Sequence, residues 1–318
     1  MLRSAPKGKG GALADIVILG IFVADAAYRA ARMPAPGETL LGTGFQLGPG
    51  GKGSNQAVAA AKAGGDVAFL SRVGADTFGA MGHAVWAEAG VKSLVIEDDA
   101  LPTGSAGIIV SEDSGQNAIV VVPGAAGALS AADVEAHRAE IESATVIVTQ
   151  LEQPIEAALR FLEIGRAAGV VTVLNPAPAA ELPEGMLGLC GYVTPNESET
   201  EALTGLPVTN FAEAEAAAKA LMDQGVRQGV VITMGEHGSL FYDGAEAVVT
   251  PPMAAGPVVD TTGAGDAFNG GFATALAAGL PVAEALRMAT ATAALSVTKH
   301  GTSASMPTRV EIAALLAG

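Results

Sequence analysis

A glycine-rich turn that runs directly into an expected helix is the segment best suited to chemistry: Asp260-Thr-Thr-Gly-Ala-Gly-Asp266. The backbone N–H groups of Gly263, Ala264 and Gly265 would point outward at the positive end of the helix dipole, where they can bind a phosphate or a developing anion. Asp266 lies beside that site in the first helical turn, so its carboxylate could act as a general base on a hydroxyl nucleophile. The alternative is that Asp266 is only a favourable first-turn acid and that the glycines only form a tight turn.

A second segment, Thr194-Pro-Asn-Glu-Ser-Glu199, places Asn196 and Glu199 three residues apart at an expected helix start. That spacing puts both side chains on one face, where they could hold a hydrated Mg²⁺ through its waters. The same spacing predicts a capping box, with Asn196 as the N-cap residue and Glu199 as the N3 residue. Both interpretations can hold at once.

A third segment contains the G-x-G-x-x-G spacing at Gly48, Gly50 and Gly53. This spacing is typical of dinucleotide-binding sites and would suit a nicotinamide-dependent dehydrogenase. The match is weak, because the segment follows a Pro/Gly-rich stretch rather than a regular first strand. In addition, Lys52 puts a charge where the backbone should approach the ligand closely. The segment is not a P-loop either, since Gly53 follows the lysine in place of Ser or Thr.

Short apolar segments alternate with alanine-rich helical stretches along most of the chain. The expected strands are 15–20, 67–73, 144–150, 170–174, 191–194 and 229–234, and the expected helices are 54–64, 78–90, 155–169, 197–204, 211–224, 263–278 and 282–298. This alternation predicts an α/β fold with a mostly parallel sheet covered by helices on both faces. Ligands should then bind at the carboxyl ends of the strands.

Two stretches interrupt the alternation. Residues 24–47 are rich in Pro and Gly, and residues 103–122 have the pattern of a hairpin around a polar turn. We expect both to form a small β flap, with lid segments at about 21–48 and 102–122, on a single domain spanning residues 14–318. Residues 1–13 are expected to be a disordered tail.

The chain has 318 residues and a formal net charge of −16 at pH 7, from 17 Lys+Arg and 33 Asp+Glu. A nucleic-acid partner is therefore not expected, because such binding uses clustered basic residues. The longest apolar runs are shorter than the ~20 residues that a bilayer span needs, so no membrane span is expected. The single cysteine, Cys190, forms no intrachain disulfide and is expected to be a core residue of a cytoplasmic protein.

These segments, in this order, make the sequence resemble the ribokinase-like, or PfkB-type, carbohydrate kinases from about residue 15 to residue 317. The matching motifs are Pro36-Gly-Glu-Thr39, Gly50-Gly-Lys-Gly-Ser-Asn-Gln-Ala-Val58, Leu151-Glu152, Leu174-Asn-Pro-Ala-Pro178, Thr194-Pro-Asn-Glu-Ser-Glu199, Ile232-Thr-Met-Gly235 and Asp260-Thr-Thr-Gly-Ala-Gly-Asp-Ala-Phe-Asn269. The resemblance implies a ribokinase-like three-layer αβα sandwich with a mostly parallel sheet and a small β lid. It also implies ATP-dependent transfer of the γ-phosphate to the terminal hydroxyl of a pentose, with D-ribose giving ribose 5-phosphate.

The resemblance also implies roles for residues at matching positions. Asp266 would take the proton from the sugar's primary hydroxyl, and the amides of Gly263, Ala264 and Gly265 would bind the transferring phosphoryl group. Sugar hydroxyls would be held by Asp25, Gly51, Lys52, Gly53, Asn55, Glu152 and Asp266. ATP would contact Asn196, Glu199, Thr233, Gly235, Gly238, Gly265 and Thr290, with Mg²⁺ held near Asn196 and Glu199 through water. A monovalent cation, typically K⁺, would bind Asp260 and Ser305 with the main-chain oxygens of Thr262, Ser296, Lys299 and Gly301.

The lid of the family closes over the sugar, and the resemblance implies a homodimer through it. One departure bears on the sugar: where the family has Asn two residues before the sugar-binding Asp25, this chain has Val23. Valine neither donates nor accepts a hydrogen bond, so discrimination for the facing hydroxyl should be lost. The alternatives to ribose are 2-deoxyribose, fructose and nucleosides, and a further alternative is a non-catalytic sugar-binding protein on the same scaffold.

Overall fold

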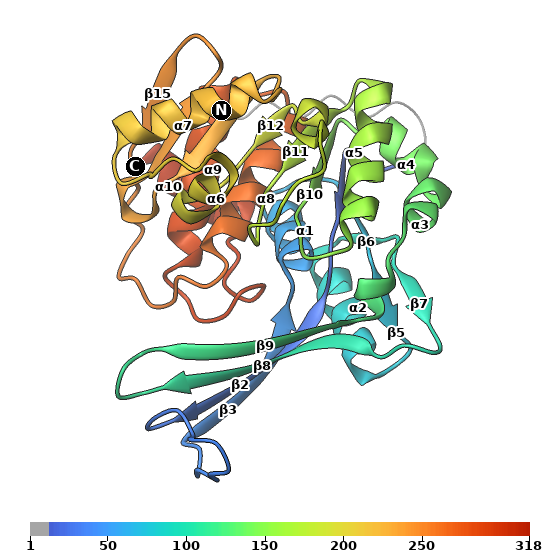
Figure 1. Cartoon of the computed structure of the whole chain (residues 1–318), viewed down its shortest axis with the longest axis vertical. Helices are drawn as coiled ribbons and strands as arrows, with labels where there is room; N and C mark the ends of the chain where they lie inside the picture. Colours follow the sequence, from blue (N-terminus) through green and yellow to red (C-terminus); the bar gives the residue numbers. More distant parts are fainter. Residues whose placement is uncertain (1–12) are drawn as a thin grey trace.

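The structure is a computed structural model that describes residues 13–318 (Figure 1). The expected tail therefore lies, apart from residue 13, outside the described residues. A nine-stranded sheet runs through the body in the order β15-β14-β13-β12-β11-β10-β1-β4-β6. Its strands are β1 (Ile16–Leu19), β4 (Val67–Leu70), β6 (Lys92–Ser93), β10 (Val146–Thr149), β11 (Val171–Leu174), β12 (Tyr192–Val193), β13 (Gly229–Thr233), β14 (Ser239–Tyr242) and β15 (Ala247–Thr250).

The body sheet is parallel from β6 to β13, and β14 and β15 add an antiparallel edge. Its central strands are uninterrupted apolar runs, such as Ile-Val-Ile-Leu in β1, and all four residues of β1 are buried. Such runs are typical of parallel strands with both faces covered, because each side chain packs against a helix whichever way it points.

Two layers of helices cover the sheet. Ile16 and Ile18 pack on the layer that contains α1 (Lys52–Lys62), α2 (Thr77–Ala89), α8 (Ala264–Ala277), α9 (Val282–Ser296) and α10 (Arg309–Ala317). Val17 and Leu19 point the other way, toward α3 (Ala131–Ala136), α4 (Arg138–Ser143) and α5 (Ile155–Ala168). On that same side, α6 (Glu197–Thr204) and α7 (Phe211–Asp223) cover the other half of the sheet. The predicted three-layer αβα sandwich is confirmed.

A second sheet of four strands, which we call the lid, projects from the body (Figure 1). Its order is β3-β2-β8-β9, with β2 (Val23–Ala30), β3 (Gly44–Gly50), β8 (Thr103–Ser111) and β9 (Asn117–Gly124). The expected hairpin is present as β8 and β9, and the predicted mostly parallel sheet with a small β lid is confirmed. Several large apolar side chains of the lid are exposed: Tyr28, Phe45, Leu47, Ile119, Val120, Val121 and Val122.

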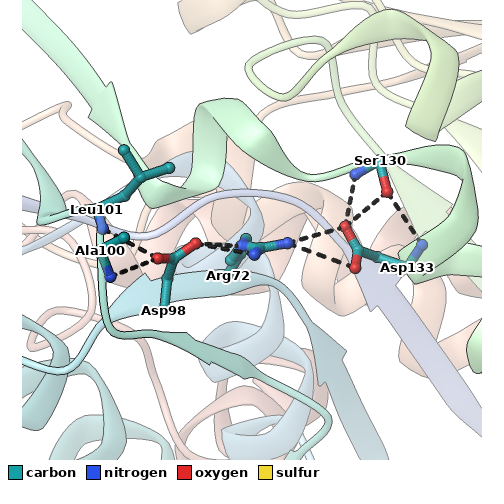
Figure 2. Close-up of polar contacts among 6 residues, drawn as sticks. All are labelled: Arg72, Asp98, Ala100, Leu101, Ser130 and Asp133. Atoms are coloured by element: carbon teal, nitrogen blue, oxygen red, sulfur yellow. Dashed lines mark hydrogen bonds and ion pairs between the residues drawn. The ribbon is translucent and has the colours of Figure 1, made fainter.

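A charged cluster at the base of the β8–β9 hairpin, which we call the arginine clamp, consists of Arg72, Asp98 and Asp133 (Figure 2). Arg72 begins β5 (Arg72–Gly74), which pairs with β7 (Ile96–Asp98) in a two-stranded sheet. Its Nε donates to Asp98 at 2.9 Å, and its Nη1 donates to Asp133 at 3.2 Å. One guanidinium therefore joins the end of β7 to α3.

The two aspartates of the clamp also hold the backbone on either side of the hairpin (Figure 2). Asp98 accepts the N–H groups of Ala100 and Leu101, just before β8 begins, at 2.8 and 2.9 Å. Asp133 accepts the N–H and O–H of Ser130, the N-cap residue of α3, at 2.9 and 2.8 Å. The clamp thus ties the chain that enters the hairpin to the chain that leaves it.

Candidate active site

Asp266 lies in the first turn of α8, buried with about 6% of its surface exposed. One carboxylate oxygen accepts the side-chain amide N–H of Asn55 at 3.0 Å, and the other accepts that of Gln56 at 3.1 Å. Burial raises the pKa of Asp266, against the opposing influence of the Lys52 charge and of these two hydrogen bonds. The structure therefore brings the expected base together with two residues of α1 that are more than two hundred positions away in the sequence.

The N-terminus of α8 is open in front of Asp266. Gly263 is its N-cap residue with a φ of +80°, and no side chain caps the helix. Within residues 13–318, the N–H groups of Gly263 and Gly265 donate to no protein oxygen. A Cβ added at Gly265 would meet no atom within 4 Å, so a ligand can approach these amides. Unpaired amides at a helix N-terminus suit a phosphate or a developing anion.

The turn before α8 has fewer unpaired amides than the sequence predicted. The sequence predicted three unpaired amides, at Gly263, Ala264 and Gly265, but the Ala264 N–H donates to the Thr261 carbonyl at 3.2 Å. That bond closes the tight turn that leads into α8, so a turn of this type uses one of its own amides. In the structure, the unpaired pair is Gly263 and Gly265.

Glycine is required where the second motif meets the body. Gly51, the N-cap residue of α1, has a φ of +87°, and a Cβ there would lie 2.5 Å from the Ile21 carbonyl oxygen. A Cβ on Gly53 would lie 2.6 Å from the Cα of Gly20, the residue that follows β1. The chain therefore turns here and packs backbone against backbone. The helix α1 begins directly after this turn, at Lys52, two residues before the expected start.

Glu152 lies just after β10 and faces the start of α1. Its carboxylate accepts the backbone N–H of Lys52 at 2.8 Å. Burial raises its pKa to about 7, and the nearby charges of Asp266 and Asp25 act in the same direction. A carboxyl with this pKa changes its protonation near neutral pH, and its ionised form is a strong acceptor for a hydroxyl.

The lid supplies Asp25 from β2. A Cβ on Gly50 of β3 would collide with the Asp25 carboxylate, so that glycine makes room for it. Burial raises the pKa of Asp25 to about 6. Val23, two residues earlier, is 4% exposed and packs in a small apolar cluster with Ile21 and Ala126. The wall beside Asp25 is therefore apolar where a polar side chain was expected by resemblance.

Asn196 and Glu199 form the predicted capping box at the start of α6. Asn196 accepts the Glu199 N–H at 2.8 Å, and Glu199 accepts the Asn196 N–H at 2.9 Å. Burial raises the pKa of Glu199, and the charge of Asp266 acts in the same direction. The capping interpretation is thus confirmed, and no group of three or more His, Cys, Asp or Glu side chains within residues 13–318 could hold a metal by itself.

The remaining residues expected at a nucleotide are placed around β13. Thr233 ends β13 and forms a β-bridge with Asn196. Gly235 begins the short helix η3 (Gly235–His237), and Gly238 follows with a φ of +100°. Thr290 lies in α9, buried, and its hydroxyl has no partner within the described residues. An orphan buried hydroxyl suits contact with a bound ligand.

The loop before α8 closes onto the chain that follows α9. The Asp260 carboxylate accepts the N–H of Thr262 at 2.9 Å and that of Gly301 at 3.0 Å. Burial raises the pKa of Asp260, but these hydrogen bonds outweigh burial and hold it below the usual value. Asp260 is therefore brought together with two of the residues expected around a monovalent cation.

The other three residues of that expected site lie in the same region. The Ser296 carbonyl accepts the Lys299 N–H at 3.3 Å, and the Lys299 ammonium pairs with Glu311 at the start of α10. Ser305 is fully buried, and its hydroxyl donates to the Thr302 carbonyl at 2.8 Å. A hydroxyl that donates one bond keeps its lone pairs for a cation, so these residues fit such a site.

The dinucleotide interpretation finds no support in the geometry. Gly48 and Gly50 belong to β3 of the lid, and α1 follows from there. The dinucleotide motif requires the turn after a central strand of a parallel sheet. The weak match was a coincidence of spacing.

Sequence reasoning assigned no role to Gln56, which donates directly to Asp266. It also passed over Asn175, which accepts from Gln56 at 3.0 Å. Both are nearly or fully buried. For Gln56 the available signal was its position in α1 between Asn55 and the apolar run at 57–61, since a buried amide must have hydrogen-bond partners.

The chain matches the pfkB family carbohydrate kinase over residues 13–309. It is 39% identical to the ribokinase of Haemophilus influenzae over 297 residues, which cover 93% of this chain and 96% of that protein. It is 37% identical to a deoxyribokinase of Salmonella typhi over 295 residues, 92% of this chain and 95% of that protein. Its fold is similar to that of Arabidopsis thaliana ribokinase complexed with ribose and ATP, with a TM-score of 0.89, 31% identity and coverage of 96% and 99% of the two chains. Within residues 13–318, no helix is long and apolar enough to cross a membrane.

Proposed function

Because the chain belongs to the pfkB family of carbohydrate kinases, we propose that it transfers the γ-phosphate of ATP to the terminal hydroxyl of D-ribose. The observation that carries the proposal is Asp266, a buried carboxylate beside the unpaired amides of Gly263 and Gly265. A hydroxyl that meets both would lose its proton to the carboxylate while the amides stabilise charge on the phosphoryl group.

In this mechanism, Asp266 accepts the proton of the attacking hydroxyl as the oxygen forms its bond to the γ-phosphorus and the bond to the ADP oxygen breaks. The hydrogen bonds from Asn55 and Gln56 fix the direction of the carboxylate. The amides at the α8 N-terminus face the developing charge, and burial of the site keeps water from competing with the sugar.

The sugar hydroxyls would be held by residues from both the body and the lid. Asn55, the backbone at Gly51 and Gly53, and the charge of Lys52 come from the start of α1, and Glu152 faces them. Asp25 approaches from the lid strand β2. The carboxylates of Glu152 and Asp25 are good acceptors for hydroxyls when they are ionised.

A second candidate substrate, 2-deoxyribose, is favoured by one specific observation. Val23 presents an apolar surface beside Asp25. Because Val23 forms no hydrogen bond with a sugar hydroxyl, a sugar that lacks this hydroxyl loses no binding energy at this position. The 37% identity to a deoxyribokinase supports keeping this substrate in any test. Fructose and nucleosides remain alternatives within the same reaction.

ATP would lie at the C-terminal half of the sheet, between β13 and α9. Support comes from the bridged pair Thr233 and Asn196, from the glycines at 235 and 238, and from the orphan hydroxyl of Thr290. Glu199 and Asn196 would orient the waters of Mg²⁺, which would neutralise phosphate charge when bound.

We also propose a K⁺ site at the loop that Asp260 closes. The donors would be the Asp260 carboxylate, the Ser305 hydroxyl and the main-chain oxygens of Thr262, Ser296, Lys299 and Gly301. The supporting observation is that Asp260 already joins residues 260–262 to residue 301 next to the α8 N-terminus. A bound cation there would stiffen the turn that carries the unpaired amides.

The exposed apolar side chains of the lid support a homodimer in which two lids pack together. Exposed apolar surface of this kind is typical of an interaction site. Because ATP is a cytoplasmic substrate, we place the enzyme in the cytoplasm.

The function is tested by an ADP-release assay over ribose, 2-deoxyribose, fructose and nucleosides, with and without K⁺, and by identifying the phosphorylated position of the product by ³¹P NMR. The proposal expects ribose to give the highest kcat/KM and to be phosphorylated at O5. Higher kcat/KM with 2-deoxyribose would establish the second candidate. Sugar binding without ADP release would establish the non-catalytic alternative and overturn the kinase assignment.

A further inference from the structure

Within residues 13–318, the hydrogen bonds to the Asp266 carboxylate come only from neutral side-chain amides. Gln56 is the central one: its Nε2 donates one N–H to Asp266 at 3.1 Å and the other to Asn175 at 3.0 Å. Its Oε1 accepts the Nε2–H of Gln150 at 2.6 Å. Gln150 donates to the carbonyl side of the Gln56 amide. If the Gln56 amide were flipped, its NH₂ would face the Gln150 NH₂, and its oxygen would face the oxygens of Asp266 and Asn175. The Gln56 N–H must therefore face the Asp266 carboxylate.

The network continues until it returns to α8. Asn175 donates to the Thr194 carbonyl at 3.0 Å, and the Thr194 hydroxyl donates to Asn269 at 2.6 Å. Asn269 then donates to the carbonyl of Gly265 at 2.9 Å. Gly265 is the residue before Asp266, so the chain of bonds closes on the turn where it began.

We call this closed set the amide ring: Gln56, Asn175, Thr194 and Asn269, together with Gly265 and Asp266. Its four side chains are at most 6% exposed, and none of them carries a charge. It joins α1 to the ends of β11 and β12 and to the first turn of α8. A satisfied, buried network of this kind holds its members in one arrangement.

We propose that Gln56 is a positioning residue for Asp266, and that the amide ring sets the carboxylate and the Gly265 N–H in one fixed geometry. The inference rests on the proposed function. A carboxylate has about four lone-pair directions. Asn55 and Gln56 occupy one on each oxygen and leave the others for the substrate hydroxyl. The neutral amides orient the base without offering it a competing proton.

The first test replaces Gln56 with leucine, which has a similar size and cannot donate. We expect kcat to fall about tenfold to a hundredfold while the KM for the sugar changes less than threefold, because a misdirected base affects the reaction more than binding. The matched control is Gln153→Leu. Gln153 is an equally buried glutamine that bonds to Thr149 and to the backbone of Gln150 and does not touch Asp266.

The second test, Gln56→Glu, keeps the acceptor for Gln150 and places an acid beside Asp266. Two adjacent carboxyls share a proton, so the acidic limb of the pH profile of kcat should move up by at least one pH unit. The other charged groups around Asp266 are Lys52 on α1, Glu152 after β10 and Glu199 on α6. They are unchanged in both variants.

An NMR titration of Asp266 in the ligand-free protein separates this inference from the proposed function. Loss of a bond to the charged form should raise the pKa of Asp266 in Gln56→Leu and leave it unchanged in Gln153→Leu. A wild-type kcat and an unshifted pKa in Gln56→Leu would overturn the inference, as would equal losses in Gln153→Leu. If the wild-type protein phosphorylates no sugar, the proposed function fails while the pKa comparison still decides the role of Gln56.

Discussion

The amide ring of the body and the arginine clamp at the base of the lid both hold chain segments in place, but with opposite chemistry. The ring is uncharged apart from Asp266, and its side chains are almost completely buried. The clamp is made of three charged side chains, of which Arg72 remains 24% exposed. The difference matches the solvent exposure of the two clusters. Burying an ion pair costs desolvation free energy that the attraction between the charges does not always offset, whereas neutral amides can be buried once all their hydrogen bonds are formed.

The two regions also differ in the mobility that their roles require. The strands β11 and β12, which lead to Asn175 and Thr194 of the ring, belong to a sheet covered on both faces and are almost entirely buried. The lid strand β9 is exposed along most of its length. A site built on the covered sheet is expected to be rigid, and a lid tethered at its base by partly exposed ion pairs can adjust beyond the tether. Substitutions at Gly53, Glu152 and Arg72 test that contrast, with expected effects that decrease in this order.

Gly53→Ala disturbs the packing of the body near the amide ring. The new Cβ would lie 2.6 Å from the Cα of Gly20 and 3.0 Å from Oε1 of Gln150, the residue that donates to Gln56. We expect kcat/KM to fall about a hundredfold, because shifts of about an ångström at a reacting site cost that much, and stability to fall by about 1–3 kcal/mol from overpacking. Steady-state kinetics and urea unfolding measure both.

The control is Gly48→Ala in β3 of the lid, where a Cβ would meet nothing within 4 Å. This change should alter kcat/KM and stability little. Equal effects of the two substitutions would show that the body is no more closely fitted than the lid.

Glu152→Gln removes the charge that faces Lys52 and the proposed sugar site. Because hydrogen bonds to charged groups are worth about 1.5–3 kcal/mol, the sugar KM should rise about tenfold to a hundredfold. For the wild-type enzyme, the KM should rise as pH falls through the pKa of Glu152, about 7, and that of Asp25, about 6. A KM for the wild type that is flat between pH 5.5 and 8 would contradict this role.

The same substitution should increase stability. Burial raises the pKa of Glu152 from 4.5 to about 7, so the folded protein binds more protons than the unfolded chain between these pH values. Stability of the wild type is therefore lost as pH rises through this window, by up to about 3 kcal/mol. Glutamine does not ionise, so Glu152→Gln should melt above the wild type at pH 8 and close to it at pH 4.5. Lower melting of the variant at pH 8 would count against a carboxylate whose charged form is disfavoured by desolvation.

Arg72→Ala opens the clamp at the base of the lid. Because partly exposed ion pairs contribute little, we expect the sugar KM to rise only a few-fold and amide hydrogen exchange in β8 and β9 to become faster. High salt should bring the wild type toward the variant, because salt screens exposed charges.

Arg160→Ala is the control for the clamp. Arg160 pairs with Glu135 of α3 and with Glu163 of α5, and contacts neither end of the hairpin. It should leave the exchange of β8 and β9 unchanged. A salt effect on Gln56→Leu as large as that on Arg72→Ala would erase the distinction between the two regions.

The sequence predicted the parts of the fold and site that depend on local patterns. Apolar runs separated by alanine-rich stretches indicated the parallel sheet, and the glycine-rich turn before Asp266 indicated an open helix N-terminus. The six-residue helices α3 and α4 and the β14–β15 edge were missed, because segments this short carry almost no periodicity.

The rest of the site depends on contacts between distant segments. Nothing local to Gln56 shows that Asp266 and Asn175 will lie beside it, or that Asn269 will return the network to Gly265. The unpaired amides were overestimated for a similar reason, since the bond from Ala264 to Thr261 depends on the exact turn. Motifs therefore indicated the candidate reacting groups, and only the structure showed which residues hold them in place.

Asp266 is the proposed base of the sugar kinase, and Asp266→Asn is the most direct test of that role. The asparagine keeps the size of the side chain and cannot accept the proton, so kcat should fall by about 10²–10⁴-fold. ATP binding, measured by calorimetry on the same protein, should stay within about twofold of the wild type. Turnover of ribose by Asp266→Asn at a rate near that of the wild type would show that Asp266 is not the base.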